Sequence, residues 1–276
     1  MNRRNYEDII KSSINYSLIT VLFFTTIAIT LKSPENIKFK NILVITFCTT
    51  TCLSVLYLIL TTFNTGYIPY VNDPLEYREK NDRYCTKCKL FKPERAHHCR
   101  RCNRCIKKMD HHCPWVGRCV NNDNLAHFIR FLFFVSLSSF ISSMIYFFFI
   151  YAFLKKNSIL NNFIFLSLIS FHFVLTLLIS IFTCTLFVFN LLLLLRNITF
   201  IEKSILFDIE RIGVLLKKNP YDFGKFRNLV NLLGKPYFFF LFGENVGNGT
   251  DFEKKFESEP WPPVKIPRWY NYEIDV

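Results

Sequence analysis

Four long runs of apolar residues constrain this chain more than any other feature of its sequence. They are Ile14 to Leu31, Ile42 to Phe63, Phe128 to Leu154 and Phe163 to Leu195, and none contains an Asp or Glu. A helix needs roughly 20 residues to cross the ~30 Å hydrocarbon core of a bilayer, and each run is about that long or longer. The pattern predicts an all-α integral membrane protein with four transmembrane helices.

The first run has an alternative interpretation as a cleaved signal peptide, because basic residues precede it. Glu7 and Asp8 also precede it, however, and no A-x-A-like cleavage site follows Thr30. These features favour a retained helix over a signal peptide.

The distribution of Lys and Arg predicts the orientation, because cytoplasmic loops hold an excess of both. The loop from Asn64 to His127 carries thirteen and the tail from Arg196 onward carries twelve, against three in the loop 32–41 and two in the loop 155–162. We expect the middle loop and both termini to be cytosolic. The predicted segments are a cytosolic N-tail (1–13), transmembrane helices 1 and 2 (14–63), a cytosolic cysteine-rich zinc domain (64–127), transmembrane helices 3 and 4 (128–195) and a cytosolic C-terminal region (196–276).

The net charge of +13 invites comparison with nucleic-acid-binding proteins. The basic residues lie beside the membrane spans, however, and form no basic stripe with interleaved aromatic residues. We therefore expect no nucleic-acid partner. Attraction to the lipid bilayer, or to a phosphate-bearing cofactor at its surface, explains the charge better.

The middle loop holds seven of the ten Cys and four His between residues 85 and 119. In a cytosolic loop, metal binding explains them better than disulfides do. Two C-x2-C pairs, Cys85 with Cys88 and Cys99 with Cys102, are typical of zinc sites. Two zinc ions need eight ligands and eleven Cys and His are present, so three are spare.

Spacing alone does not identify the three spare residues, but chemistry favours a set that contains His111 and Cys113. A Cys becomes a nucleophilic thiolate when an adjacent His lowers its pKa. Asp110 can orient His111 and stabilise the imidazolium, as in a catalytic triad.

The segment "YCTKCKLFKPERAHHCRRCNRCIKKMDHHCPWVGRCVNNDNLAHF" resembles the cysteine-rich domain of the DHHC protein S-acyltransferases, the palmitoyltransferases, in every spacing from Cys85 to Cys119. The resemblance extends to four spans with this domain between the second and third. It implies two structural zinc ions, the first held by Cys85, Cys88, His98 and Cys105 and the second by Cys99, Cys102, His112 and Cys119.

The resemblance further implies a ping-pong protein S-palmitoyltransferase with an acyl-enzyme on Cys113, His111 as the base and Asp110 as its support. The co-substrate would be palmitoyl-CoA or another long-chain acyl-CoA, and the acceptors would be cysteines of membrane-associated proteins. We expect the protein in the Golgi or ER membrane, with the plasma membrane as the alternative. The cations available for the phosphates of acyl-CoA are Arg83, Lys92, Arg95, Lys107 and Lys108.

This chain departs from the family pattern at two places. The family's D-P-G motif reads "NTG" at residues 64–66, and its T-T-x-E motif reads Thr199, Phe200, Ile201, Glu202, so that Phe200 replaces a hydroxyl that would face the catalytic carboxylate. The segment "NPYDFGKFRN" fits a family motif in which Asn228 is a buried amide that ties the tail to the helices. We expect an amphipathic helix within residues 196–212 and a loosely ordered end from Gly243 to Val276.

Three other functions are alternatives to an acyltransferase. A catalytically weak membrane scaffold that uses the zinc module to bind partners would be favoured by a changed Cys113 or His111, and both are present. A RING-type module fails on ligand spacing and leaves "DHHC" unexplained. A redox C-x2-C enzyme lacks the thioredoxin-like βαβ pattern.

Overall fold

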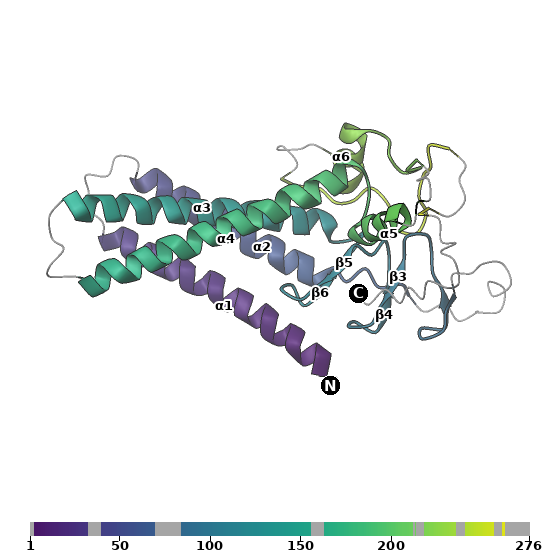
Figure 1. Ribbon diagram of the computed structural model, residues 1–276, viewed down its shortest axis with the longest axis horizontal. Coiled ribbons are helices and arrows are strands. Elements are labelled where there is room, and N and C mark those ends of the chain that lie inside the picture. Colours follow the sequence, from purple (N-terminus) through teal and green to yellow (C-terminus); the bar gives the residue numbers. More distant parts are fainter. Residues whose placement is uncertain are drawn as a thin grey trace. The chain divides into compact units, whose positions relative to one another are not determined.

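Six helices make up most of the computed structural model, which describes residues 3–32, 40–69, 84–155, 163–211, 213, 218–235, 241–256 and 261–262 (Figure 1). Four of them are long: α1 (Arg3–Lys32), α2 (Lys40–Phe63), α3 (Leu125–Lys155) and α4 (Phe163–Leu195). Two are short: α5 (Phe200–Arg211) and α6 (Lys225–Leu233). Among the described residues, four helices are long and apolar enough to cross a membrane, as the apolar runs predicted.

Three small antiparallel hairpins lie between α2 and α3 in the chain. Their strands are β1 (Tyr84–Cys85) with β2 (Leu90–Phe91), β3 (His97–Cys99) with β4 (Arg104–Ile106), and β5 (His111–Cys113) with β6 (Arg118–Val120). Each strand has two or three residues, too few for a sheet that could be stable on apolar burial alone. The predicted architecture, four spans with a cysteine- and histidine-rich region between the second and third, is therefore confirmed.

The described residues divide into two compact units. One contains the described residues of 13–59 and 129–190, and the other contains the described residues of 1–12, 60–128 and 191–276. In the first unit, Phe47 packs with Ile141 and Ile145 in a buried cluster. Large apolar side chains also face outward, among them Phe171, which is 63% exposed. Such exposure suits a surface in contact with lipid, and the chain is a multi-pass membrane protein.

Hydroxyl groups hold the helices of this first unit together. Thr51 of α2 lies 2.6 Å from the Ser138 hydroxyl of α3. Thr26 of α1 lies 2.8 Å from the Ser142 hydroxyl, also on α3. Small polar residues of this kind let membrane helices approach closely and bond across the contact. Ser138 and Ser142 of the third span therefore contribute to helix packing.

The second unit gathers the three hairpins with α5, α6 and the described part of the C-terminal region. Its apolar core is small and includes Ile106, Met109 and Ile201. The helix expected within residues 196–212 is present as α5. Asn228 is fully buried and donates to the Leu195 carbonyl at 2.9 Å, which is the tie between the tail and the helices that the sequence predicted.

The expectation of a loose end from Gly243 is wrong for residues 243–256. The amide of Val246 donates to the Asn231 carbonyl at 3.0 Å, and the Lys254 ammonium lies 2.6 Å from the Glu94 carboxylate. Polar composition misled the prediction, because these side chains and backbone groups bond to the folded unit rather than to water.

Candidate functional site

The alternation of side chains along β3 and β5 separates adjacent Cys and His residues. Successive side chains of a strand point to opposite faces. In β5, His111 and Cys113 therefore share one face while His112 takes the other. The same rule separates His98 from Cys99 in β3. One short strand can thus contribute side chains to two different sites. This explains why His and Cys residues are adjacent in the sequence without a spacer.

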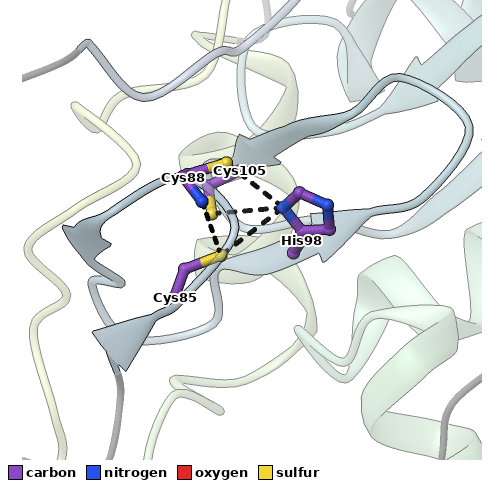
Figure 2. A group of neighbouring side chains, drawn as sticks. All are labelled: Cys85, Cys88, His98 and Cys105. Atoms are coloured by element: carbon purple, nitrogen blue, oxygen red, sulfur yellow. Dashed lines mark hydrogen bonds between the residues drawn. The ribbon is translucent and has the colours of Figure 1, made fainter.

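The first cluster joins hairpins β1–β2 and β3–β4 (Figure 2). Nδ1 of His98 lies 3.5 Å from Sγ of Cys85, 3.2 Å from Sγ of Cys88 and 3.8 Å from Sγ of Cys105. His98 and Cys105 are cross-strand partners, which brings an imidazole and a thiol together by register alone. The turn between β1 and β2 supplies Cys88.

The second cluster joins hairpins β3–β4 and β5–β6 in the same way. Nδ1 of His112 lies 3.5 Å from Sγ of both Cys99 and Cys102 and 3.6 Å from Sγ of Cys119. His112 and Cys119 again face each other across the strands. Hairpin β3–β4 contributes to both clusters, so the three hairpins form one connected module.

Both clusters fit zinc. In each, three thiol sulfurs and one imidazole nitrogen lie within 4.8 Å of one another. Three Cys and one His is a typical donor set of closed, tetrahedral, structural zinc sites. The bound metal would supply the folding free energy that such short hairpins lack, since structural zinc contributes to folding directly. All eight ligands expected from the sequence thus fall into two groups of four.

The remaining residues of the DHHC segment lie together. Nδ1 of His111 is 2.7 Å from Oδ2 of Asp110, so the carboxylate can accept the proton of this nitrogen. Cys113 lies close enough to the same imidazole to influence its charge state. The rings of Phe128 and Phe200 stand edge-on to His111, at centroid distances of 5.4 and 6.2 Å. Asp110, His111 and Cys113 therefore lie side by side, and two aromatic rings contact the imidazole.

The pKa of His111 is raised to about 10. Burial by itself would lower the pKa, but the hydrogen bonds and negative charges of Asp110 and Cys113 outweigh burial. The imidazole thus favours the protonated form in this environment. A protonated imidazole can donate its proton to a leaving group, which is the role of a general acid.

A backbone N–H at the beginning of α5 fixes the second oxygen of Asp110. The amide of Phe200 donates to Oδ1 of Asp110 at 2.9 Å. The first N–H groups of a helix have no partner within the helix, and a carboxylate there is further stabilised by the helix dipole. Phe200 therefore orients Asp110 through its main chain, even though its side chain lacks the hydroxyl expected from the family pattern.

The beginning of α5 is itself held by a capping box. The amide of Glu202 donates to Oγ1 of Thr199 at 3.2 Å, and the amide of Thr199 donates to Oε2 of Glu202 at 2.9 Å. Glu202 also receives two bonds from Arg95, at 2.6 and 2.8 Å, and both side chains of this ion pair are 1% exposed. The Thr-x-x-Glu spacing is a visible sequence signal for the capping box, but the partner Arg95 lies far away in the chain.

The backbone of the "NTG" segment is bound by two buried asparagines that sequence reasoning did not single out for this role. Asn124 donates to the Asn64 carbonyl at 2.8 Å, and Asn121 donates to the Thr65 carbonyl at 3.2 Å. Gly66 has a φ of +61°, and a Cβ at this position would collide with the Asn121 side chain. The close contact between Gly66 and Asn121 therefore requires glycine, which is the one residue of the family's D-P-G motif that this chain retains.

The cations expected to bind acyl-CoA have different surroundings. The Arg95 guanidinium is buried and is occupied by Glu202 and Asn197, so it is not available to a phosphate in this structure. Lys108 is buried, and burial lowers its pKa well below the ordinary value. Lys107 pairs with Asp123 at 2.9 Å. Arg83 lies outside the described residues.

Lys92 instead lines a cavity of about 290 Å³ beside the first cluster. Lys87, His97 and Arg100 line the same cavity, and His98 forms part of its wall. Lys87 and Arg100 are each next to a candidate zinc ligand in the sequence, and neither is among the cations expected from the sequence. The cavity therefore concentrates positive side chains that are suited to bind phosphate.

Comparison with known proteins agrees with this site. A model of the DHHC palmitoyltransferase family matches residues 78–205. A protein of Yarrowia lipolytica called Palmitoyltransferase PFA4 is 30% identical over an alignment of 260 residues, covering 84% of this chain and 72% of the relative. A Candida glabrata protein of the same name is 32% identical, again over 260 residues, covering 71% of this chain and 69% of the relative. The chain belongs to the DHHC palmitoyltransferase family.

Proposed function

We propose that this protein S-palmitoyltransferase works through an acyl-enzyme on Cys113, with His111 as acid and base and Asp110 as the group that orients His111. The observation that carries the proposal is the division of the Cys and His residues. Eight of them form two clusters that fit zinc, and Cys113 is left outside both, next to an imidazole that a carboxylate holds.

In the first half-reaction, the Cys113 sulfur attacks the carbonyl carbon of the acyl-CoA thioester. A new C–S bond forms, the bond to the CoA sulfur breaks, and the proton that left Cys113 passes from His111 to the departing CoA thiolate. In the second half-reaction, His111 accepts the proton of an incoming protein thiol, whose sulfur takes the acyl group and releases Cys113. Each step exchanges one thioester for another, so positioning of the groups decides the rate.

The co-substrate is a long-chain acyl-CoA, chiefly palmitoyl-CoA, because the protein lies in the membrane where such a chain is soluble. Burying each CH2 of the chain is favourable by ~0.8 kcal/mol. The acceptors are cysteines of membrane-associated proteins, and the termini and zinc module face the cytosol. The membrane is that of the Golgi or ER, with the plasma membrane as the alternative.

The phosphates of acyl-CoA bind the cations of the 290 Å³ cavity, Lys92 together with Lys87 and Arg100. Lys92→Gln is expected to raise the KM for palmitoyl-CoA several-fold and to leave kcat unchanged, because the lost contact is made equally in ground and transition states. Lys89→Gln is the matched control, since Lys89 is exposed and does not line the cavity. An unchanged KM in Lys92→Gln would place the phosphates elsewhere.

The acyl-enzyme is tested by incubating purified protein with an alkyne-bearing analogue of palmitoyl-CoA and detecting label that hydroxylamine removes. Wild type should carry the label and Cys113→Ser should not, at unchanged zinc content. His111→Ala should label about 100- to 10,000-fold more slowly, the usual contribution of general acid–base catalysis. Cys184→Ser, which changes an exposed cysteine of α4, should label like wild type. Equal label in wild type and Cys113→Ser would refute the proposal.

A further inference from the structure

The two metal clusters differ in the surroundings of their histidines. In both, Nδ1 faces the thiols, so a bound metal would leave Nε2 as the protonated nitrogen of each ring. Nε2 of His98 is buried and has no hydrogen-bond partner among the described residues. Nε2 of His112 lies 3.0 Å from Oδ2 of Asp8. Among the residues that the structure describes, a carboxylate therefore faces Nε2 of His112 and none faces Nε2 of His98.

Asp8 is 5% exposed, and both of its oxygens are engaged by the second cluster. Oδ2 faces His112, and Oδ1 accepts from Nη1 of Arg101 at 2.5 Å. Arg101 lies in the turn between the ligands Cys99 and Cys102. A buried carboxylate is costly unless it is paired and hydrogen-bonded, so these two partners explain how Asp8 can be buried.

The beginning of α1 is placed by packing against hairpin β5–β6. Asp8 and Ser12 are four residues apart and lie on one face of the helix. Gly117, in the turn of the hairpin, has a φ of +73°, and a Cβ there would lie 3.3 Å from Oγ of Ser12. Ser12 thus contacts the turn of the hairpin at Gly117, and Asp8, one helical turn earlier in α1, contacts His112 in strand β5.

We propose that Asp8 is a positioning residue for the metal of the second cluster. By accepting a hydrogen bond from Nε2–H, Asp8 fixes the tautomer and the ring orientation of His112. It also makes Nδ1 a stronger ligand for the metal. Loss of such a carboxylate partner of a metal-ligating histidine typically lowers metal affinity by about 10- to 100-fold. Because His112 lies between His111 and Cys113 in β5, Asp8 also steadies the strand that carries the reactive thiol.

The test uses the full-length protein in detergent and measures zinc occupancy in buffers of graded free zinc concentration. Asp8→Asn keeps the size of the side chain and removes its charge. It should raise the free zinc concentration at half-occupancy by about 10- to 100-fold for one of the two ions. Alkylation of freed thiols, mapped by peptide mass spectrometry, should occur at Cys99, Cys102 and Cys119 and not at Cys85.

Three further variants separate positioning of His112 from docking of α1. Glu7→Gln is the matched control, because Glu7 is the exposed neighbour of Asp8, and it should bind zinc like wild type. Arg101→Gln breaks the ion pair but leaves Asp8 on His112, so it should shift zinc affinity much less than Asp8→Asn. Asp8→Glu, which retains a carboxylate, should restore part of the affinity.

Two results would overturn the proposal. In the first, Asp8→Asn holds both zinc ions as wild type does, or loses both together. In the second, Arg101→Gln weakens zinc binding as much as Asp8→Asn, which would assign Asp8 to helix docking alone.

Discussion

Replacing Glu202 with Gln tests how a buried ion pair supports the Asp110–His111 pair. Glu202 caps α5 and accepts two bonds from Arg95, with both side chains 1% exposed. The first amide of α5, that of Phe200, donates to Asp110. A change at Glu202 therefore reaches the candidate catalytic carboxylate through a single turn of helix.

The magnitude follows from burial. Gln keeps the shape of Glu202 and an oxygen for the Thr199 amide, but it leaves the Arg95 guanidinium without a counter-charge. Removing one partner of a buried ion pair costs about 3–5 kcal/mol. Each 1 kcal/mol lowers the Tm of a domain of this size by about 2–4 °C, so a fall of about 10 °C is expected. Acyl-enzyme formation should also slow by about tenfold or more, since misplacing a catalytic group by ~1 Å can cost ~100-fold.

The assay is thermal unfolding in detergent, followed by labelling with the alkyne palmitoyl-CoA analogue well below the melting transition. Glu210→Gln is the matched control, the same substitution at an exposed position of the same helix, and it should change neither quantity. The double variant Arg95→Met with Glu202→Met should recover most of the lost stability, because a buried pair can often be replaced by apolar residues. A Glu202→Gln protein that melts and labels like wild type would contradict the reasoning.

Three other changes have defined outcomes. Gly66→Ala should lower the free energy of unfolding by ~1–2 kcal/mol through left-handed backbone strain alone. The loss should be larger because the added Cβ would collide with Asn121. The change is measured as a fall in Tm, and an unchanged Tm would contradict it. Burial, followed by the charge of Glu94, raises the pKa of Tyr221 above its ordinary value of about 10. The unfolded chain therefore loses this proton first as pH rises, so the contribution of the Tyr221 hydroxyl is complete below pH ~10 and declines above it. The difference in Tm between wild type and Tyr221→Phe should shrink above that pH, and a constant difference would count against the assignment. Removal of zinc by a strong chelator should abolish labelling of Cys113, although Cys113 is not a ligand, because the hairpins depend on the metal; full labelling of zinc-free protein would show that they do not.

The long-range architecture could be predicted because it depends on residues that are close in sequence. Apolar runs of membrane length predicted the four helices, C-x2-C spacing indicated zinc, and the resemblance to the DHHC family implied which eight residues form the two clusters. His111 and His112 have different surroundings, because strand alternation sends them to opposite faces. A strand of three residues, however, is too short to be recognised from its sequence pattern. The opposite orientations of His111 and His112 therefore could not be predicted without the structure of hairpin β5–β6.

The contacts that sequence reasoning missed join distant segments through single side chains. Asp8 lies 104 residues before His112 in the chain, and no local sequence pattern indicates their contact. Arg95 is one of the cations expected near the zinc clusters to bind phosphate, yet it is buried against Glu202. Phe200 was read by its side chain, whereas its backbone amide provides the bond to Asp110.

The most direct test of the account is whether the acyl group on Cys113 is a true intermediate. Wild-type protein is first labelled with palmitoyl-CoA and freed of excess CoA ester. A cysteine-bearing, membrane-bound acceptor peptide is then added, and the loss of label from the enzyme is followed in time beside its appearance on the peptide. The account predicts transfer to the peptide at a rate at least equal to steady-state turnover, and no transfer from Cys113→Ser. Label that stays on Cys113 while turnover continues from fresh palmitoyl-CoA would contradict it.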